Sequence, residues 1–138
     1  MKFPYTIPFV EAQGIELLAV GDGKSLLRLA LRDDQANHLG MAHGGVLMTL
    51  LDVAMAQSAR IKPTEQALIT VEMKTTFFRP AHGELTAQGQ LLHATERMAF
   101  TEASVLDARG RKCAHATGTF RYVNPKTRSA VLQQHDSA

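Results

Sequence analysis

"NHLGMAHGGVLMTLLDVAMAQ", residues 37–57, decides how this chain folds. Residues 46–56 are almost wholly apolar and rich in good helix formers, which predicts a helix buried on all sides. We expect Lys62 and Pro63 to close this helix. One carboxylate, Asp52, lies in the middle of the apolar run, where an ionised side chain is costly unless another group pairs with it or the protein uses it.

The segments on both sides of this helix alternate as β-strands do. Upstream, residues 3–13 suggest a short helix or turn that begins near Pro8, strand signals start around Glu16, and residues 24–32 alternate as a half-buried strand. Downstream, strands are expected over residues 68–79, 85–95, 98–107 and 112–123, with turns at 80–84 and 108–111. The long strands and short links predict an antiparallel meander.

Alternation also assigns the side chains of residues 68–79 to two faces. One face takes Ile69, Val71, Met73 and Phe77, and the other takes Thr70, Glu72, Lys74 and Thr76. The 138 residues therefore predict one α+β domain over residues 1–124, in which an antiparallel sheet wraps around one long helix. A polar tail over residues 125–138 follows it.

Composition excludes several classes of protein. Fifteen Lys and Arg against 13 Asp and Glu leave a net charge of +2, too small to argue for nucleic acid. No run approaches the roughly 20 apolar residues of a membrane span, and Pro4, Pro8 and Glu11 interrupt the N-terminal stretch that a signal peptide needs. The single cysteine, Cys113, cannot form an internal disulfide. We therefore expect a cytoplasmic protein that binds neither nucleic acid nor membrane.

Two other patterns have simpler interpretations than a ligand site. "GDGKS" at residues 21–25 resembles the end of a phosphate-binding loop, but Leu18 stands where that motif needs glycine and a strand follows, which favours a hairpin turn. The six histidines are not spaced as metal ligands, and Cys113 with His115 has no second pair of ligands. No metal site is predicted.

The glycines before the helix and the carboxylate within it point to chemistry. His43, Gly44 and Gly45 leave backbone N–H groups unsatisfied at the first turn, where an anion or a developing oxyanion can bind. Asp52 lies ~12 Å further along the helix, too far to act on the same carbonyl. A second helix running antiparallel would close the gap, so the spacing favours a two-fold dimer with two composite sites. The residues alone leave open that the glycines only form a turn and that Asp52 is structural or solvent-facing.

Further motifs extend this pattern along the chain: Asn37-x5-His43-Gly44-Gly45-x6-Asp52, Thr70-Val-Glu-Met-Lys, Phe78-Arg79-Pro80-Ala81 and "GRKCAHATGTF" at residues 110–120. With them the chain resembles the hot-dog-fold acyl-CoA thioesterases of the phenylacetic acid degradation type, over roughly residues 14–123. The resemblance implies a central helix wrapped by the sheet, dimers that often pair into tetramers, and hydrolysis without a metal or redox cofactor.

The resemblance also implies a role for each candidate catalytic residue. Gly44 would donate its backbone N–H to the thioester carbonyl oxygen, and Asp52 of the facing subunit would be the nucleophile or the general base that activates water. Asn37 would help to position the water or the carbonyl. His43 would hold the loop near the thioester or act as a base, and Thr70 would orient the water or the carboxylate.

The remaining candidates would hold the substrate. Coenzyme A carries phosphates, and Arg79 and Arg97 occupy positions where members of the family commonly have basic residues. Gly45 is also predicted to bind the substrate, because it follows Gly44, the glycine expected to stabilise the oxyanion. An adaptable acyl pocket would take Met48, Met55 and Met73, although methionines at such spacing equally fit a core.

The expected function is hydrolysis of a small or medium acyl- or aryl-CoA thioester to free acid and CoA, by a dimer or a dimer of dimers. A hot-dog hydratase or dehydratase is one alternative, but no histidine lies inside the helix near Asp52. The other is a non-catalytic acyl-CoA-binding module of the same fold, to which a carboxylate near the thioester would bring no advantage.

Overall fold

The structure is a computed structural model that describes residues 2–61 and 66–124. Its elements are α1 (Pro8–Ala12), β1 (Glu16–Gly21), β2 (Lys24–Ala30), the 3-10 helix η1 (Asp33–Gln35), α2 (Gly44–Ser58), β3 (Ala67–Phe77), β4 (Glu84–Ala94), β5 (Met98–Leu106) and β6 (Lys112–Val123). The predicted strands are all present, with bounds that differ by at most two residues. No helix in this described part is long and apolar enough to span a membrane. The predicted tail over 125–138 lies outside the described residues.

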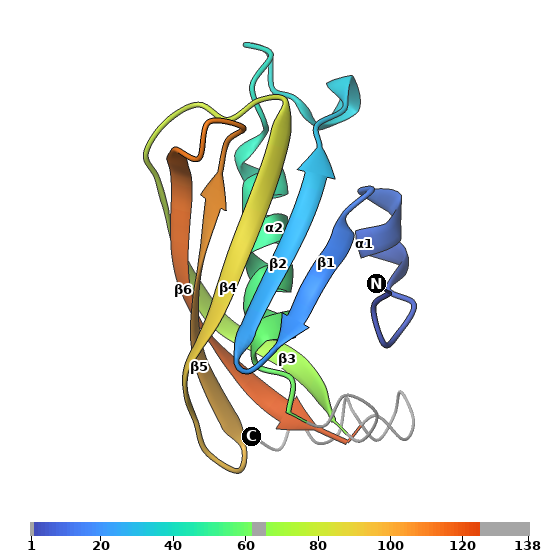
Figure 1. Ribbon diagram of the computed structural model, residues 1–138, viewed down its shortest axis with the longest axis vertical. Helices are drawn as coiled ribbons and strands as arrows, with labels where there is room; N and C mark the ends of the chain where they lie inside the picture. Colours follow the sequence, from blue (N-terminus) through green and yellow to red (C-terminus); the bar gives the residue numbers. More distant parts are fainter. Residues whose placement is uncertain (1, 62–65, 125–138) are drawn as a thin grey trace.

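The six strands form one antiparallel sheet in the order β1-β2-β4-β5-β6-β3, with α2 lying along one face (Figure 1). The hairpin β1–β2 and the meander β4–β5–β6 follow chain order, but β2 pairs with β4 and β3 pairs with β6 at the far edge. The prediction of a meander throughout is therefore wrong at β3, because α2 carries the chain across the sheet between β2 and β3. Residues 80–84 accordingly lie in a link between distant strands and do not close a hairpin.

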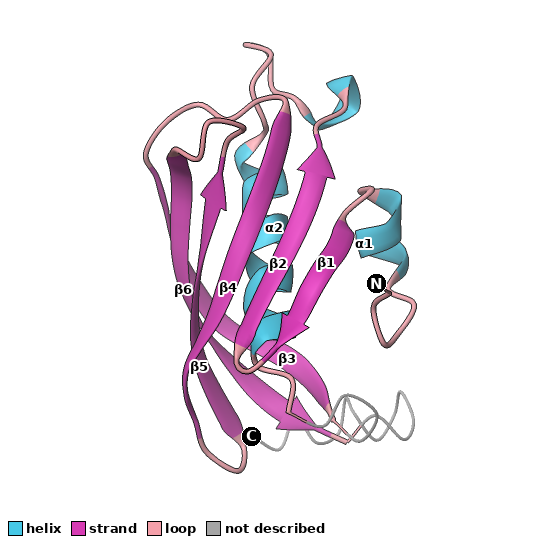
Figure 2. Cartoon of the chain, in the orientation of Figure 1, coloured by secondary structure: helices cyan, strands magenta, loops and turns pink. Residues whose placement is uncertain are grey.

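The long helix is covered on one side only. α2 spans Gly44–Ser58 and ends before Lys62 and Pro63, which lie outside the described residues. The sheet covers its inner side, where Leu50, Leu51, Ala54 and Met55 are fully buried, and Figure 2 shows α1 beside β1. An outer strip at helical spacing stays partly or fully exposed: Gly45, Met48, Thr49, Asp52 and Ala56. The prediction of burial on all sides is wrong for this strip, because the sheet curls around only part of the helix.

Two glycines let α2 approach the sheet closely. A Cβ atom on Gly89 of β4 would overlap the backbone carbonyl of Ala54, and one on Gly118 of β6 would lie 2.9 Å from Cε of Met55. The hydroxyl of Ser25 in β2 donates a buried hydrogen bond of 2.6 Å to the same Ala54 carbonyl. These contacts fix both the height and the rotation of α2 over the sheet.

A β-bulge in β3 changes which side chains face the helix. The register of β3 against β6 shifts between Thr70 and Glu72, and the extra residue reverses the alternation. Thr70 therefore faces α2 together with Met73 and Phe77, whereas Ile69 faces away. The predicted separation of Thr70 from Met73 and Phe77 is wrong, because simple alternation does not anticipate a bulge.

Gly89→Ala should destabilise the protein by about 1–3 kcal/mol or more, as overpacking of a tight contact does. The added methyl group would overlap the Ala54 carbonyl, so α2 must lift from the sheet and the bond from Ser25 must lengthen. Urea and thermal unfolding measure the loss. Gln88→Ala, a change on the exposed neighbour in β4, is the control. Equal stability of the two variants would contradict the close approach.

Candidate active site

Asp52 and Thr70 meet across the space between α2 and β3. The Thr70 hydroxyl donates a hydrogen bond of 2.6 Å to Oδ1 of Asp52. Helical spacing puts Asp52 on the open strip of α2, and the bulge turns Thr70 towards it. The bond holds the carboxylate in one orientation and leaves Oδ2 to meet a ligand.

These two side chains lie in a groove of about 440 Å³, named here the Asp52 groove. Its lining residues come from α1 and the segment before it, from α2, and from β3 and β6: Ile7, Phe9, Val10, Met48, Thr49, Asp52, Val53, Ala56, Gln57, Leu68, Thr70 and Phe120. Asp52 is the one charged residue among them. A carboxylate in the wall of an otherwise mostly apolar groove can act on an apolar ligand that lies beside it.

The surroundings of Asp52 make its carboxylate a better base. Burial raises the pKa of Asp52 above its ordinary value, and the hydrogen bond from Thr70 opposes the rise. A carboxylate with a raised pKa has a greater affinity for a proton that it removes from water. The site therefore combines desolvation, which raises the pKa of Asp52 and strengthens it as a base, with one hydrogen bond that favours its ionised form.

The N-terminus of α2 presents one available backbone N–H group. His43 is the N-cap: its Nδ1 accepts a bond of 2.9 Å from the N–H of Gly45, and its carbonyl accepts from Val46 and Leu47. The N–H of Gly44 has no acceptor within residues 2–61 and 66–124. Of the amides that the sequence left unsatisfied, this one remains for a ligand carbonyl.

Gly44 opens onto a second hollow of about 330 Å³, named here the Gly44 hollow, whose lining includes Asn37 and Arg79. Oδ1 of Asn37 accepts hydrogen bonds from the backbone N–H groups of Leu39 and Met41, at 2.9 and 3.2 Å, and so holds the loop that leads into α2. Arg79 follows the end of β3 and brings a positive charge to the same hollow. The structure therefore brings together Asn37, Gly44 and Arg79.

The Asp52 groove and the Gly44 hollow share no lining residue. The eight residues from Gly44 to Asp52 span ~12 Å along the helix axis, which keeps the two places apart within one chain. The carboxylate and the free N–H group therefore cannot act on one ligand atom from the same copy of the chain.

Comparison with known proteins identifies the family. The sequence matches the family model described as the thioesterase superfamily over residues 39–114, which is more than half of the chain. The chain belongs to the thioesterase superfamily. The match runs from the loop before α2 into the start of β6, so it includes Gly44, Asp52 and Thr70.

Individual proteins are similar to this chain over most of their length. One relative from Pseudomonas aeruginosa, which carries the name of an esterase, is 36% identical over 104 residues, 72% of this chain and 77% of its own. A conserved protein of the same organism has a TM-score of 0.81 and 28% identity, covering 87% of this chain and 97% of its own. A variant of the phenylacetic acid degradation protein PaaI from Thermus thermophilus has a TM-score of 0.74 and 27% identity, covering 83% and 98%. The predicted hot-dog fold and the resemblance to thioesterases are confirmed.

The three methionines predicted to line an acyl pocket lie in different places. Met48 lines the Asp52 groove. Met55 is fully buried beneath Gly118, and Met73 packs against the core from β3. The close approach of helix and sheet therefore takes Met55 into the core, whereas Met73 stays half-buried and lies outside both the Asp52 groove and the Gly44 hollow. That these two methionines line an acyl pocket stays a prediction.

Two predicted substrate-binding residues lie outside both the Asp52 groove and the Gly44 hollow. Arg97 belongs to the turn between β4 and β5, at the opposite end of the sheet from the loop before α2 (Figure 1). Gly45 lies with His43 in a neighbouring hollow, and His43 takes up its N–H group. The structure does not bring Arg97 together with Arg79.

Several residues of the Asp52 groove were missed by sequence reasoning. The contribution of Ile7 and Phe9 depends on how the N-terminal segment packs on α2, for which the sequence gives no local signal. Gln57 had a signal: it follows Val53 by four residues, so helical spacing puts it on the same side of α2. A polar residue at that position of an apolar helix is the feature that could have found it.

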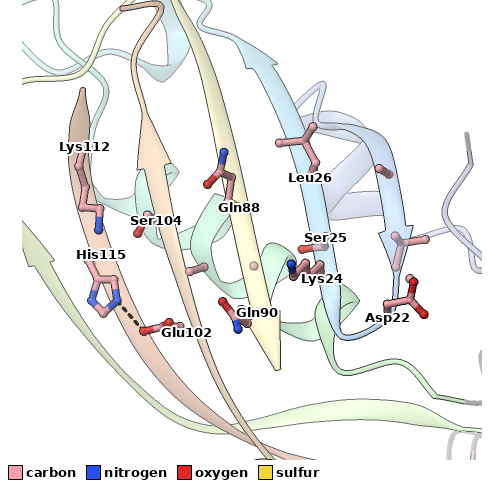
Figure 3. Close-up of a pocket in the computed structure, with 15 residues that line it drawn as sticks. Asp22, Lys24, Ser25, Leu26, Gln88, Gln90, Glu102, Ser104, Lys112 and His115 are labelled. Atoms are coloured by element: carbon pink, nitrogen blue, oxygen red, sulfur yellow. Dashed lines mark hydrogen bonds and ion pairs between the residues drawn. The ribbon is translucent and has the colours of Figure 1, made fainter. Parts of the chain in front are cut away.

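A larger hollow of about 660 Å³ lies on the outer face of the sheet, away from α2. Figure 3 shows polar side chains there, among them Gln88, Ser104 and His115, whose Nε2 lies 3.2 Å from a carboxylate oxygen of Glu102. This hollow contains no residue of the Asp52 groove or the Gly44 hollow. Within the described residues, no three His, Cys, Asp or Glu side chains gather as metal ligands would.

Asp52→Asn should make the protein more stable at neutral pH. Burial raises the pKa of folded Asp52, so its ionisation weakens the fold as the pH rises through the raised pKa; below the ordinary value of 3.8 both states are protonated and the cost vanishes. Asparagine keeps an oxygen that accepts from Thr70 but carries no charge. Melting temperatures measured from about pH 3 to about pH 8 should show an advantage that shrinks towards acid. Exposed Asp33→Asn is the control, and an advantage independent of pH would contradict the assignment.

Proposed function

We propose that this thioesterase hydrolyses acyl-CoA thioesters to a free carboxylic acid and CoA, in a site that two copies of the chain build together. The observation that carries the proposal is the division between Asp52, held by Thr70 in its groove, and the free N–H of Gly44 in a separate hollow. One half can drive the attack on a thioester and the other can stabilise the resulting oxyanion. Each half therefore needs a partner.

The proposed reaction uses water and groups of the chain itself, without a metal or cofactor. Asp52 either removes a proton from water, whose hydroxide attacks the thioester carbon, or attacks that carbon directly, and water then releases the acid from the anhydride. In both routes negative charge gathers on the carbonyl oxygen, where the Gly44 N–H of the other copy donates a hydrogen bond. In the first route the C–S bond then breaks, and the CoA thiolate takes up the proton that Asp52 removed from water. In the second route the C–S bond breaks as the anhydride forms, and the thiolate takes up a proton from the water that later hydrolyses the anhydride.

The free edge of β3 supports the pairing of two copies. β3 is hydrogen-bonded to β6 along one edge, and no described strand covers the other. Val71 and Phe77 of this edge strand are each 50% exposed, and an uncovered strand edge with apolar side chains invites pairing. A two-fold axis beside β3 would set two α2 helices antiparallel, with Gly44 of one near Asp52 of the other.

Charge and family names support a CoA thioester as the substrate. Arg79 brings a cation to the Gly44 hollow, where the phosphates of CoA would need one, and Arg97 and Gly45 are the further candidates for contact with CoA. The Thermus thermophilus relative is named for phenylacetic acid degradation, which supports a small or medium acyl or aryl group here. A hydratase is less well supported because α2 contains no histidine, and a binding module would not use Asp52.

Release of free thiol from a panel of acyl- and aryl-CoA thioesters is the direct test. The protein should hydrolyse at least one thioester, and Asp52→Asn should lower kcat by roughly 10²-fold or more, because the base or nucleophile is lost. Asp33→Asn, which changes an exposed aspartate in the same way, should leave kcat unchanged. No activity on any thioester, or an Asp52→Asn protein as active as the control, would refute the proposal.

Mixing two inactive proteins tests whether the site is shared. Gly44→Pro removes the free N–H, and proline suits the first position of a helix after an extended residue such as His43, which has φ −60° and ψ 141°. Gly44→Ala keeps the N–H and serves as the control. Dimers re-formed from equal amounts of Gly44→Pro and Asp52→Asn should regain about a quarter of the original activity, because half are mixed and each of these has one intact site. A mixture that stays inactive would place both groups in one chain's site.

Thr70→Val should move the acidic limb of the pH profile of kcat/KM to higher pH. The Thr70 hydroxyl favours the ionised form of Asp52, so its removal raises the pKa of Asp52 further and delays ionisation. Thr70→Ser keeps the donor and should leave the limb in place. A limb that does not move in Thr70→Val would show that Asp52 is not the titrating group.

A further inference from the structure

One buried amide oxygen in the Asp52 groove, Oε1 of Gln57, has no hydrogen-bond partner among the described residues. The buried polar residues of the described chain are Ser25, Gln35, Gln57, Ser58 and Thr101, and the other four are all hydrogen-bonded through their side chains. Gln57 is 5% exposed, and its Oε1 has no partner among the described residues. Of the six buried side-chain polar atoms without a partner among the described residues, only Oε1 of Gln57 belongs to a residue of the Asp52 groove. Burying a polar atom without a bond is unfavourable, so its place in the wall of this groove indicates that a ligand supplies the bond.

The position of Gln57 relates it to the proposed reaction. It follows Asp52 by five residues of α2, which is ~7.5 Å along the helix axis. Between them along α2 lie Val53 and Ala56, and Leu68 of β3 lines the same groove, so the surface between them is apolar. An acyl group whose carbonyl carbon lies at Asp52 can therefore extend along an apolar path that ends at an amide.

We infer that Gln57 selects acyl groups whose apolar chain ends in a neutral hydrogen-bonding group such as a hydroxyl. The inference rests on the proposed function, since it takes the thioester carbon to lie at Asp52. An amide has both a carbonyl acceptor and N–H donors, so it can accept a hydrogen bond from a hydroxyl group or donate one to it. A charged group finds no counter-ion, because Asp52, the carboxylate proposed to act on the thioester, is the only charged residue among the described residues that line the groove.

A matched pair of substrates tests the inference: a straight-chain six-carbon acyl-CoA and its derivative with a terminal hydroxyl. The protein should prefer the hydroxylated chain by roughly five- to tenfold in kcat/KM, the effect of one neutral hydrogen bond. Gln57→Met keeps an unbranched side chain of similar length without its hydrogen-bonding groups, and should reverse the preference. Gln88→Met makes the same change on the outer face of the sheet and should keep the preference.

The possible failures can be told apart. Equal kcat/KM for both substrates, or a preference unchanged by Gln57→Met, overturns the role of Gln57 and leaves the thioesterase proposal standing. If neither substrate is hydrolysed, calorimetric titration of the same pair decides: tighter binding of the hydroxylated chain that Gln57→Met abolishes supports the role, and equal Kd values overturn it. Gln57 could instead support contact between two copies of the chain, and gel filtration tests this. A Gln57→Met protein that no longer forms the oligomer but keeps the preference for the hydroxylated substrate would assign Gln57 to an interface and overturn the inference.

Discussion

The contact between the Ala54 carbonyl and the bare backbone of Gly89 governs the rest of the molecule. A glycine in β4 lets the helix descend onto the sheet, and Ser25 bonds the same carbonyl from the neighbouring strand. With that side of α2 pinned, its large apolar residues must enter the core, and the residues about half a turn away must stay outside it. The orientation of Asp52 is therefore set by a contact on the opposite side of the helix, which involves no catalytic group.

The loop before α2 shows the same indirect control at the Gly44 hollow, the other half of the proposed site. His43 supplies a side-chain acceptor and a carbonyl that together satisfy the N–H groups of Gly45, Val46 and Leu47. The cap therefore does more than stabilise the helix, since it leaves the N–H of Gly44 as the donor in the hollow. A donor that is already fixed needs no reorganisation when charge develops opposite it, which is the condition for effective oxyanion stabilisation. Asn37 contributes by holding the loop from which that donor emerges.

The sequence predicts those features that depend on local pattern. Each strand and the long helix follow from periodicity, and the spacing of Gly44 and Asp52 predicts their separation without any coordinates. Prediction from the sequence fails where one added residue or a contact between distant segments decides which way a side chain or strand is placed. The bulge after Thr70 reverses which side chains of β3 face α2. The crossing by α2 places β3 at the far edge of the sheet, and close packing of helix and sheet buries Met55 in the core. The resemblance to family motifs still selected Thr70 as a candidate. A motif reflects positions that come together after packing, whereas periodicity reflects only the local alternation of side chains.

Two polar groups in the same groove lower the stability of the fold in different ways. Asp52 is desolvated enough to raise its pKa, and Gln57 buries an oxygen that nothing described in the chain satisfies. A groove selected for stability alone would carry apolar residues at both positions, as the neighbouring Val53 and Ala56 show. Both costs fall in the wall of one groove, ~7.5 Å apart along the helix axis, with apolar surface between them. The acyl chain that we propose would account for both together: it would give the carboxylate a reaction to drive and the amide a group to bind, and it would cover the apolar surface between them.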